Sequence, residues 1–105
     1  MKYKKIRIAL TTFSSKENAT NVVSQLLNKK LISCAQIEGP IQSSFFWENN
    51  YNQISEWRVV LKFSEAKENE LFEEIHAIHE YKTPQWVAWS VDSSSTYAEW
   101  VEFGS

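Results

Sequence analysis

The sequence contains very little cysteine and glycine, and it has no internal repeat. Cys34 is the only cysteine among 105 residues, so an intrachain disulfide is impossible and a disulfide-stapled secreted scaffold is excluded. With only two glycines, the chain has no glycine-rich phosphate loop. It also lacks low-complexity tracts and linkers, so we expect a single domain over residues 1–105.

An excess of positive charge and a long apolar segment are also missing. The formal net charge is −2 and the sequence pI is about 5.7, which argues against a nucleic-acid binder that relies on a basic face. No segment approaches the ~20 apolar residues of a membrane span, and residues 1–13 contain no apolar run of signal-peptide length. We therefore expect a soluble, cytoplasmic protein that binds neither nucleic acid nor a membrane.

Aromatic residues, in contrast, are abundant. The chain has five Trp, six Phe and four Tyr, and its hydrophobic share of 43% predicts a folded protein rather than a disordered one. Trp and Tyr are enriched where proteins contact one another. We therefore expect some of these side chains to fill an interface as well as a core.

A long β-hairpin is predicted over residues 31–63. Its first half has apolar side chains on one parity, which is the period of a strand with one buried face: Ala35, Ile37, Ile41, Phe45 and Trp47. Gly39-Pro40 interrupts this alternation and predicts a bulge or a bend. The polar run 48–50 then reverses the chain. The returning strand alternates again through Trp57, Val59, Leu61 and Phe63.

The length of this hairpin has a consequence for assembly. Each arm is roughly twice the usual strand length of about 5–6 residues, so the hairpin overhangs a domain of this size. Its exposed edges and aromatic side chains require a cover, and another copy of the chain would supply one. This feature predicts a homo-oligomer.

The other elements complete an α+β pattern. We expect a strand over 5–13, a helix to about residue 30, a helix over 66–79, a strand over 85–91, a turn over 92–95 and a short tail helix. Capping boxes of Ser14 with Glu17 and of Thr96 with Glu99 begin the first and last helices. The order β-α-β-β-α-β plus a C-terminal helix predicts a ferredoxin-like split βαβ sandwich with a long bent hairpin. Two helices cover one face of such a sheet, and subunit association is expected to cover the other.

Five short patterns stand in order along nearly the whole chain. They are Leu-Thr-Thr-Phe at 10–13, Lys-Leu-Ile-Ser-Cys-Ala at 30–35, Phe-Trp-Glu at 46–48, His-Glu-Tyr-Lys-Thr-Pro at 79–84 and Tyr-Ala-Glu-Trp at 97–100. Together they resemble the CutA family of divalent-cation tolerance proteins. The resemblance implies a tight homotrimer built through the long hairpin, with an architecture like that of the trimeric signalling protein PII. It also implies a link to tolerance of copper and other divalent cations, and no family-wide catalytic reaction.

Metal binding is therefore considered first at the end of the second helix. The resemblance implies copper ligands at three positions, where this chain has Thr11, Ile78 and His79. Independently, His76 and His79 are three residues apart on a predicted helix with Glu80 nearby, and two imidazoles with a carboxylate suit a divalent metal. The alternative is a structural His79, because it continues an apolar stripe and a helix C-terminus favours histidine.

Two further candidates lie in or near the hairpin. A Cys34 thiolate would suit Cu(I), although packing as a small hydrophobe is the more common role of a free cysteine. Trp47, Lys62 and Tyr81 are candidates for a cleft between subunits, in which Lys62 would bind an anion. The alternative is a solvated lysine beside two interface aromatic side chains.

These residues leave three functions open, and none of them is enzymatic. The first is a homotrimer that responds to divalent metal ions such as copper and binds them weakly at most. The second is a PII-like signalling trimer that binds a small anionic ligand in clefts between subunits. The third is a scaffold or anchoring protein without a ligand. No cofactor is required in any of them, and a divalent cation is the only candidate.

Overall fold

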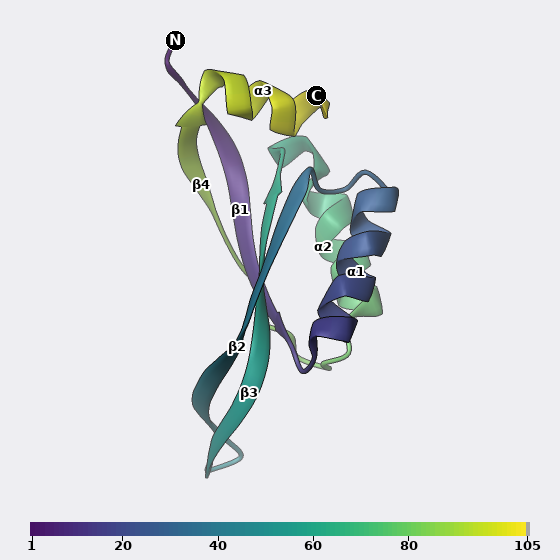
Figure 1. Cartoon of the computed structure of the whole chain (residues 1–105), viewed down its shortest axis with the longest axis vertical. Coiled ribbons are helices and arrows are strands. Elements are labelled where there is room, and N and C mark those ends of the chain that lie inside the picture. Colours follow the sequence, from purple (N-terminus) through teal and green to yellow (C-terminus); the bar gives the residue numbers. More distant parts are fainter. Residues whose placement is uncertain (105) are drawn as a thin grey trace.

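The chain forms a four-stranded antiparallel sheet with three α-helices (Figure 1). The computed structural model describes residues 1–104. The elements are β1 (Tyr3–Phe13), α1 (Lys16–Asn28), β2 (Cys34–Trp47), β3 (Asn50–Phe63), the 3-10 turn η1 (Glu65–Lys67), α2 (Glu68–Ile78), β4 (Val87–Ser94) and α3 (Ser95–Phe103). None of the helices within 1–104 is long and apolar enough to cross a membrane.

The strands follow the spatial order β2-β3-β1-β4, and every neighbouring pair is antiparallel. This order and the succession of elements confirm the predicted α+β arrangement of a split βαβ unit with a C-terminal helix. The hairpin of β2 and β3 projects well beyond the helices, and the molecule measures 49 × 25 × 22 Å (Figure 1). The overhang expected from the strand lengths is therefore present.

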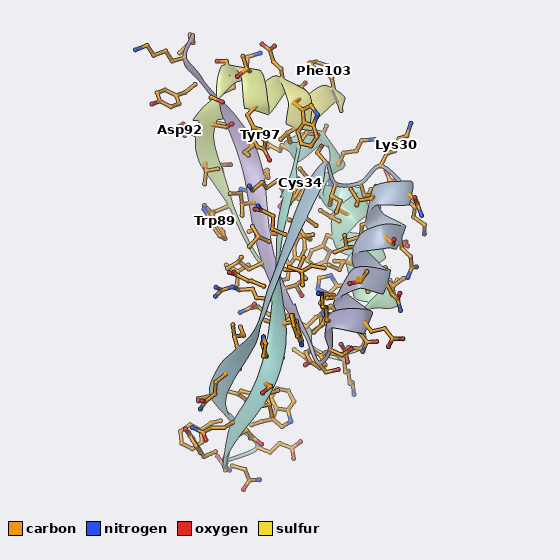
Figure 2. All side chains as sticks on the ribbon, viewed as in Figure 1. Lys30, Cys34, Trp89, Asp92, Tyr97 and Phe103 are labelled. Atoms are coloured by element: carbon orange, nitrogen blue, oxygen red, sulfur yellow. The ribbon has the colours of Figure 1, made fainter. Side chains whose placement is uncertain are left out.

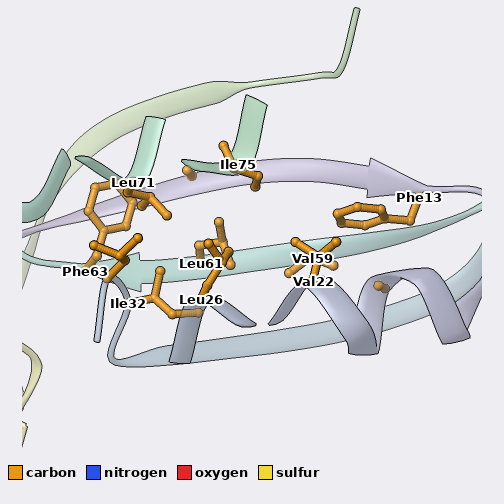
Figure 3. Packing of buried hydrophobic residues seen from close by; sticks show 12 residues of the cluster. Phe13, Val22, Leu26, Ile32, Val59, Leu61, Phe63, Leu71 and Ile75 are labelled. Carbon is orange, nitrogen blue, oxygen red and sulfur yellow. The ribbon is translucent and has the colours of Figure 1, made fainter. Parts of the chain in front are cut away.

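The main core lies between α1, α2 and one face of the sheet (Figure 3). Strands contribute alternate side chains to this face, because β1 and β3 place Thr11 opposite Val59 and Ala9 opposite Leu61. The helices contribute apolar stripes at the spacing of helical turns. The buried members include Phe13, Val22, Leu26, Val59, Leu61, Phe63, Leu71 and Ile75.

The ends of α1 differ by one or two residues from the prediction. Ser15, not Ser14, is the N-cap, and its hydroxyl accepts a hydrogen bond from the Asn18 amide at 3.0 Å. The Ser14 hydroxyl instead contacts Glu80. The helix also ends at Asn28 rather than at residue 30. The shift at the start of the helix follows from a choice between two adjacent serines that sequence alone does not settle.

The last strand also differs from the prediction. It begins at Val87 rather than at residue 85, and it continues to Ser94 where a turn was expected. Residues 92–94 pair with the start of β1, and Asp92 adds an ion pair with Lys5. Because the strand runs directly into α3, Ser94 is the N-cap in place of Thr96, and its hydroxyl accepts from the Tyr97 amide.

The Gly39-Pro40 bulge corrects the prediction of a single apolar face along β2. Ile37 lies opposite Val59, whereas Ile41 lies opposite Glu56, so β2 carries one extra residue between them. Directly opposed residues share a face of the sheet. Ala35 and Ile37, which precede the bulge, therefore face the helices together with Val59. The residues beyond it, Ile41, Phe45 and Trp47, face the opposite side, because a shift of one residue inverts the alternation.

This opposite side of the sheet is only partly covered, and we call it the open face. At one end α3 packs Ala98 and Val101 over Ile6 of β1. Farther along β4, Val87 and Trp89 remain 49% and 39% exposed. The open face comprises Ile8, Leu10, Ile41, Phe45, Trp47, Ile54, Val60, Val87 and Trp89. An unpartnered apolar surface of this kind marks an interaction site.

Candidate functional site

A groove of about 1090 Å³ lies on the open face, between the projecting half of the hairpin and the segment that joins α2 to β4. Trp47 contributes from the hairpin and Tyr81 from the connecting segment. The structure therefore brings together two of the three residues predicted for a cleft. The third, Lys62, is not among the residues that line the groove. The groove is lined mainly by Leu10, Thr12, Ile41, Phe45, Trp47, Ile54, Glu56, Arg58, Glu80, Tyr81, Lys82 and Pro84.

A buried carboxylate organises one wall of this groove. Glu56 is only 7% exposed, and the Tyr81 hydroxyl donates a 2.7 Å hydrogen bond to it. Burial raises the pKa of the Tyr81 hydroxyl, and the hydrogen bond to Glu56 and its negative charge raise it further. Sequence reasoning missed Glu56, because its place between Ser55 and Trp57 is typical of a solvated strand position. The hydrogen bond ties the connecting segment to β3.

Charged side chains of both signs line the groove. Arg58 donates to Glu38 at 2.7 Å, and this pair is about half exposed. Within residues 1–104, Lys82 has no carboxylate partner. Glu80 accepts hydrogen bonds from the amide and the hydroxyl of Ser14. Burial acts to raise the pKa of the Glu80 carboxyl, but the hydrogen bonds outweigh it and the pKa lies below its usual value.

His79 is held by contacts that use both of its ring nitrogens. Nδ1 accepts a 3.0 Å hydrogen bond from the Tyr81 amide, so the network assigns the proton of the neutral ring to Nε2, which lies 3.1 Å from Thr11 Oγ1. The ring also stacks on Phe13 at a centroid distance of 4.3 Å. Burial lowers the pKa of the imidazole. In this arrangement His79 has no lone pair free for a metal ion.

The other proposed metal ligands do not form a cluster with His79 within residues 1–104. His76 is exposed, and its Nδ1 lies 2.8 Å from the Phe72 carbonyl oxygen. Cys34 lies on the open face opposite Lys62, whereas His79 contacts Thr11 on the helix-covered face. Over 1–104, the structure contains no group of three or more His, Cys, Asp or Glu side chains that could hold a metal ion. Metal binding by His79 and Cys34 therefore stays a prediction without a ligand cluster to support it.

Cys34 and Lys62 both interact instead with Tyr97 of α3. Cys34 and Tyr97 lie near one another in Figure 2. The Lys62 ammonium lies 5.5 Å from the centre of the Tyr97 ring, a cation–π contact. Burial raises the pKa of the Tyr97 hydroxyl, and interactions with Cys34 raise it further. Lys62 is thus placed to hold α3 on the sheet. This contact lies outside the groove that Trp47 and Tyr81 line.

The family model of the CutA1 divalent ion tolerance protein matches residues 7–103. The chain belongs to this family. The CutA1 assignment confirms the resemblance drawn from the five short patterns, which are distributed over the same range.

Individual CutA proteins agree with this assignment. The divalent-cation tolerance protein CutA of Thermotoga maritima is 34% identical over 95 residues, which cover 90% of this chain and 93% of that protein. The crystal structure of CutA1 from Ehrlichia chaffeensis superposes with a TM-score of 0.88 at 30% identity, covering 96% of this chain and 94% of the other. CutA1 from Pyrococcus horikoshii gives a TM-score of 0.86 at 31% identity, covering 90% of this chain and 93% of the other.

The cellular location of CutA proteins differs among relatives. The Archaeoglobus fulgidus protein is described as periplasmic, and the similar Oryza sativa protein as chloroplastic. A cytoplasmic location for this chain therefore stays a prediction.

Proposed function

We propose that the protein is a homotrimer that takes part in tolerance of divalent metal ions, such as copper, and that it acts by binding rather than by catalysis. The open face is the observation that carries the proposal. It combines exposed Val87 and Trp89 on β4 with Phe45, Trp47 and Ile54 of the hairpin, which are between 39% and 56% exposed. Burying such a surface stabilises an assembly by roughly 25 cal/mol per Å² of apolar area.

The edges of the sheet support self-association as well. Strands β2 and β4 are the two outer strands, so each presents unpaired backbone groups along one side. A head-to-tail contact between the β2 edge of one subunit and the β4 edge of the next generates a closed ring when the rotation permits it. The trimer implied by the family resemblance is such a ring, and each hairpin in it would lie along a neighbour.

Sedimentation velocity at micromolar concentration tests this assembly. Trp89→Glu places a charge at the centre of the open face, and Leu27→Glu places the same charge at a helix position of similar exposure on the other side of the sheet. We expect a trimer for the wild type and for Leu27→Glu, and dissociation for Trp89→Glu. A stable monomeric wild type would overturn the proposal.

The metal role rests on the family and predicts weak binding at most. Binding through His79 requires the loss of at least one hydrogen bond of its ring, to Thr11 or to Tyr81, and this cost reduces the affinity. Titration of Cu(II) into the wild type and His79→Ala tests whether the residue takes part. Equal affinities would exclude His79 as an important ligand for Cu(II).

The groove supports a second candidate function, a PII-like trimer that binds a small anion. The specific observation is that Lys82 has no carboxylate partner within 1–104 while it lines the same groove as Trp47 and Tyr81. A screen of nucleotides and organic acids by calorimetry, with Lys82→Gln as the variant, tests this function. If the wild type binds an anion and Lys82→Gln does not, the PII-like signalling function is supported. If the wild type binds none of the compounds, a scaffold without a ligand is favoured.

A further inference from the structure

A second cavity, of about 410 Å³, lies at the opposite end of the molecule from the hairpin tip. It is formed where the end of α1, the start of η1 and the last turn of α3 meet, a region marked by Lys30 and Phe103 in Figure 2. None of its lining residues belongs to the groove on the open face. Its volume is within the range of sites for small organic molecules, about 300–1,000 Å³.

The lining of this cavity combines polar groups with aliphatic and aromatic side chains. Leu31 is 2% exposed and forms part of the lining, and Leu27 adds a second aliphatic side chain. Trp100 lines the cavity from α3, and Phe103, which is 76% exposed, stands beside it. Such walls accommodate a flat apolar group, because aromatic rings provide large contact areas at a low cost in conformational entropy.

Two lysines give the cavity a positive rim. Lys30 and Lys67 both line it, and neither forms an ion pair with a carboxylate within 1–104. Ser64 adds a hydroxyl that makes no capping hydrogen bond although it occupies an N-cap position. Glu102 is the one acidic side chain in the lining, so the formal balance favours an anion.

The backbone at Lys30 supplies an independent observation. Lys30 follows the C-cap of α1 with a φ of 58°, a left-handed conformation in which glycine or asparagine is usual. Its amide donates to Leu27 and the next amide donates to Leu26, which is the hydrogen-bond pattern of a Schellman motif. A lysine at this position carries strain that glycine would avoid, and strained positions concentrate at functional sites.

We propose that this cavity binds a small aromatic carboxylate, with the ring against Trp100 and Leu27 and the carboxylate between Lys30 and Lys67. Ammonium groups bind carboxylates as point charges, and Ser64 can donate a third hydrogen bond. This inference does not depend on trimer formation or on a metal role, because every lining residue comes from one subunit and none is a proposed metal ligand.

Binding of 1-naphthoate to the full chain, followed by NMR through the amide shifts of residues 27–33 and the Trp100 indole, tests the proposal. Acetate and 1-naphthalenemethanol serve as probes that lack the ring or the charge. We expect 1-naphthoate to bind at least about tenfold more tightly than either one, equivalent to about 1.4 kcal/mol. Equal binding of the neutral alcohol would overturn the proposal, because it would mean that the lysines do not select an anion.

Variants separate the ligand role of Lys30 from a structural one. Lys67→Gln and Lys30→Gln are each expected to weaken naphthoate binding about three- to fivefold, the range of a partly exposed ion pair. Lys16→Gln makes the same charge change on an exposed position of α1 outside the cavity and should leave the affinity unchanged. Unchanged affinity in the variant that lacks both Lys30 and Lys67 would overturn the assignment.

Lys30→Gly provides the decisive comparison. Glycine relieves the left-handed strain, so Tm is expected to rise by a few degrees, roughly the shift that such a change gives in a domain of this size. The affinity for naphthoate is expected to fall as in Lys30→Gln. A variant that is more stable and also binds naphthoate like the wild type would show that Lys30 does not contact the ligand.

Discussion

Several polar side chains at the end of α2 are committed to structure. His79 binds Thr11 and the Tyr81 amide, Glu80 binds Ser14, and Tyr81 binds the buried Glu56. These contacts connect the segment after α2 to β1, to the start of α1 and to β3. Residues 79–81 looked in the sequence like a source of metal ligands. Within one subunit they instead hold the segment between α2 and β4 against the sheet.

Tyr81→Phe tests the hydrogen bond to Glu56. The variant leaves a carboxylate that is 7% exposed without its donor, so we expect the free energy of unfolding to fall by about 1–3 kcal/mol. Urea denaturation at pH 7 measures the change. Tyr3→Phe, at a tyrosine that is 61% exposed, is the matched control and should have little effect. Equal stability of the two variants would show that the contact is not formed in solution.

His79 and Glu80 predict a loss of stability in acid. The pKa of each group is lowered in the folded chain, so the unfolded chain binds more protons as the pH falls. The contribution of His79 is complete above its usual pKa of 6.5 and declines below it, and that of Glu80 declines below 4.5. Unfolding curves between pH 8 and 3 should show this decline.

Glu80→Gln is the variant for this pH dependence. It removes the titrating carboxylate that Ser14 binds, so we expect a lower stability at pH 7 and a shallower loss of stability below pH 4.5. Glu17→Gln, on the exposed first turn of α1, is the control. If Glu80→Gln shows the same acid slope as the wild type, Glu80 does not account for this part of the pH dependence.

At the scale of elements, much of the fold could be predicted from periodicity. The four strands, the first two helices and the core positions on β3 follow from alternation and from helical stripes, since Val59, Leu61 and Phe63 are all buried. The ends of the elements were harder to predict from the sequence. Ser14 and Ser15 are chemically equivalent as N-caps, and the polar residues at 92–94 resemble a turn although they extend the ladder of β1.

The bulge is the element that sequence reasoning located but did not interpret. Gly39-Pro40 marked its position, yet the apolar residues on both sides kept the same parity in the sequence. Only the pairing with β3 reveals that one residue has been added and that the faces are exchanged. For the same reason the groove could not be predicted in full, because Ile41 and Trp47 share a face with Glu56 only in this register.

Gly39→Ala tests the geometry of the bulge. A Cβ at this position would lie 2.8 Å from the Trp57 ring and 3.1 Å from the Glu56 carbonyl oxygen, so the strand must shift. We expect a loss of about 1–3 kcal/mol in the free energy of unfolding, as for other overpacked sites. Ser44→Ala, at an exposed position of the same strand, is the control for denaturation measurements. A Gly39→Ala variant as stable as this control would contradict the tight packing at the bulge.

At the scale of the whole molecule, the two faces of the sheet are covered very differently. The two helices cover the main core on one side, whereas α3 protects only one end of the other. The elongated shape follows from a hairpin whose far half has no helix beside it (Figure 1). A fold with this division of surfaces is suited to a stability that depends on neighbouring subunits.

Trp47→Ala distinguishes an assembled protein from a solitary one. Trp47 is 56% exposed in the single chain, so its truncation should change stability by less than about 0.5 kcal/mol if the protein is monomeric. If a neighbour buries it, the cost rises to about 3–5 kcal/mol at each site, and sedimentation velocity should show dissociation. We expect the second result, with secondary structure preserved by circular dichroism.

The adjacent residue offers a matched control for this experiment. Phe46 is 74% exposed and, by strand alternation, points to the opposite side from Trp47. Phe46→Ala should therefore leave the assembly intact. Dissociation by Phe46→Ala but not by Trp47→Ala would place the interface on the helix side of the hairpin. The open face would then be rejected as the contact surface.

The single extra residue in β2 makes a deletion at the bulge easier to accept than a deletion elsewhere in this arm. Loss of the codon for Gly39 would leave one residue opposite Trp57, so Phe45 and Trp47 would still face the open side. Loss of one codon between Ile41 and Phe45, with the bulge kept, would instead turn Phe45 and Trp47 toward the side of the helices. A single-residue deletion should therefore be far less damaging at the bulge than in the arm beyond it.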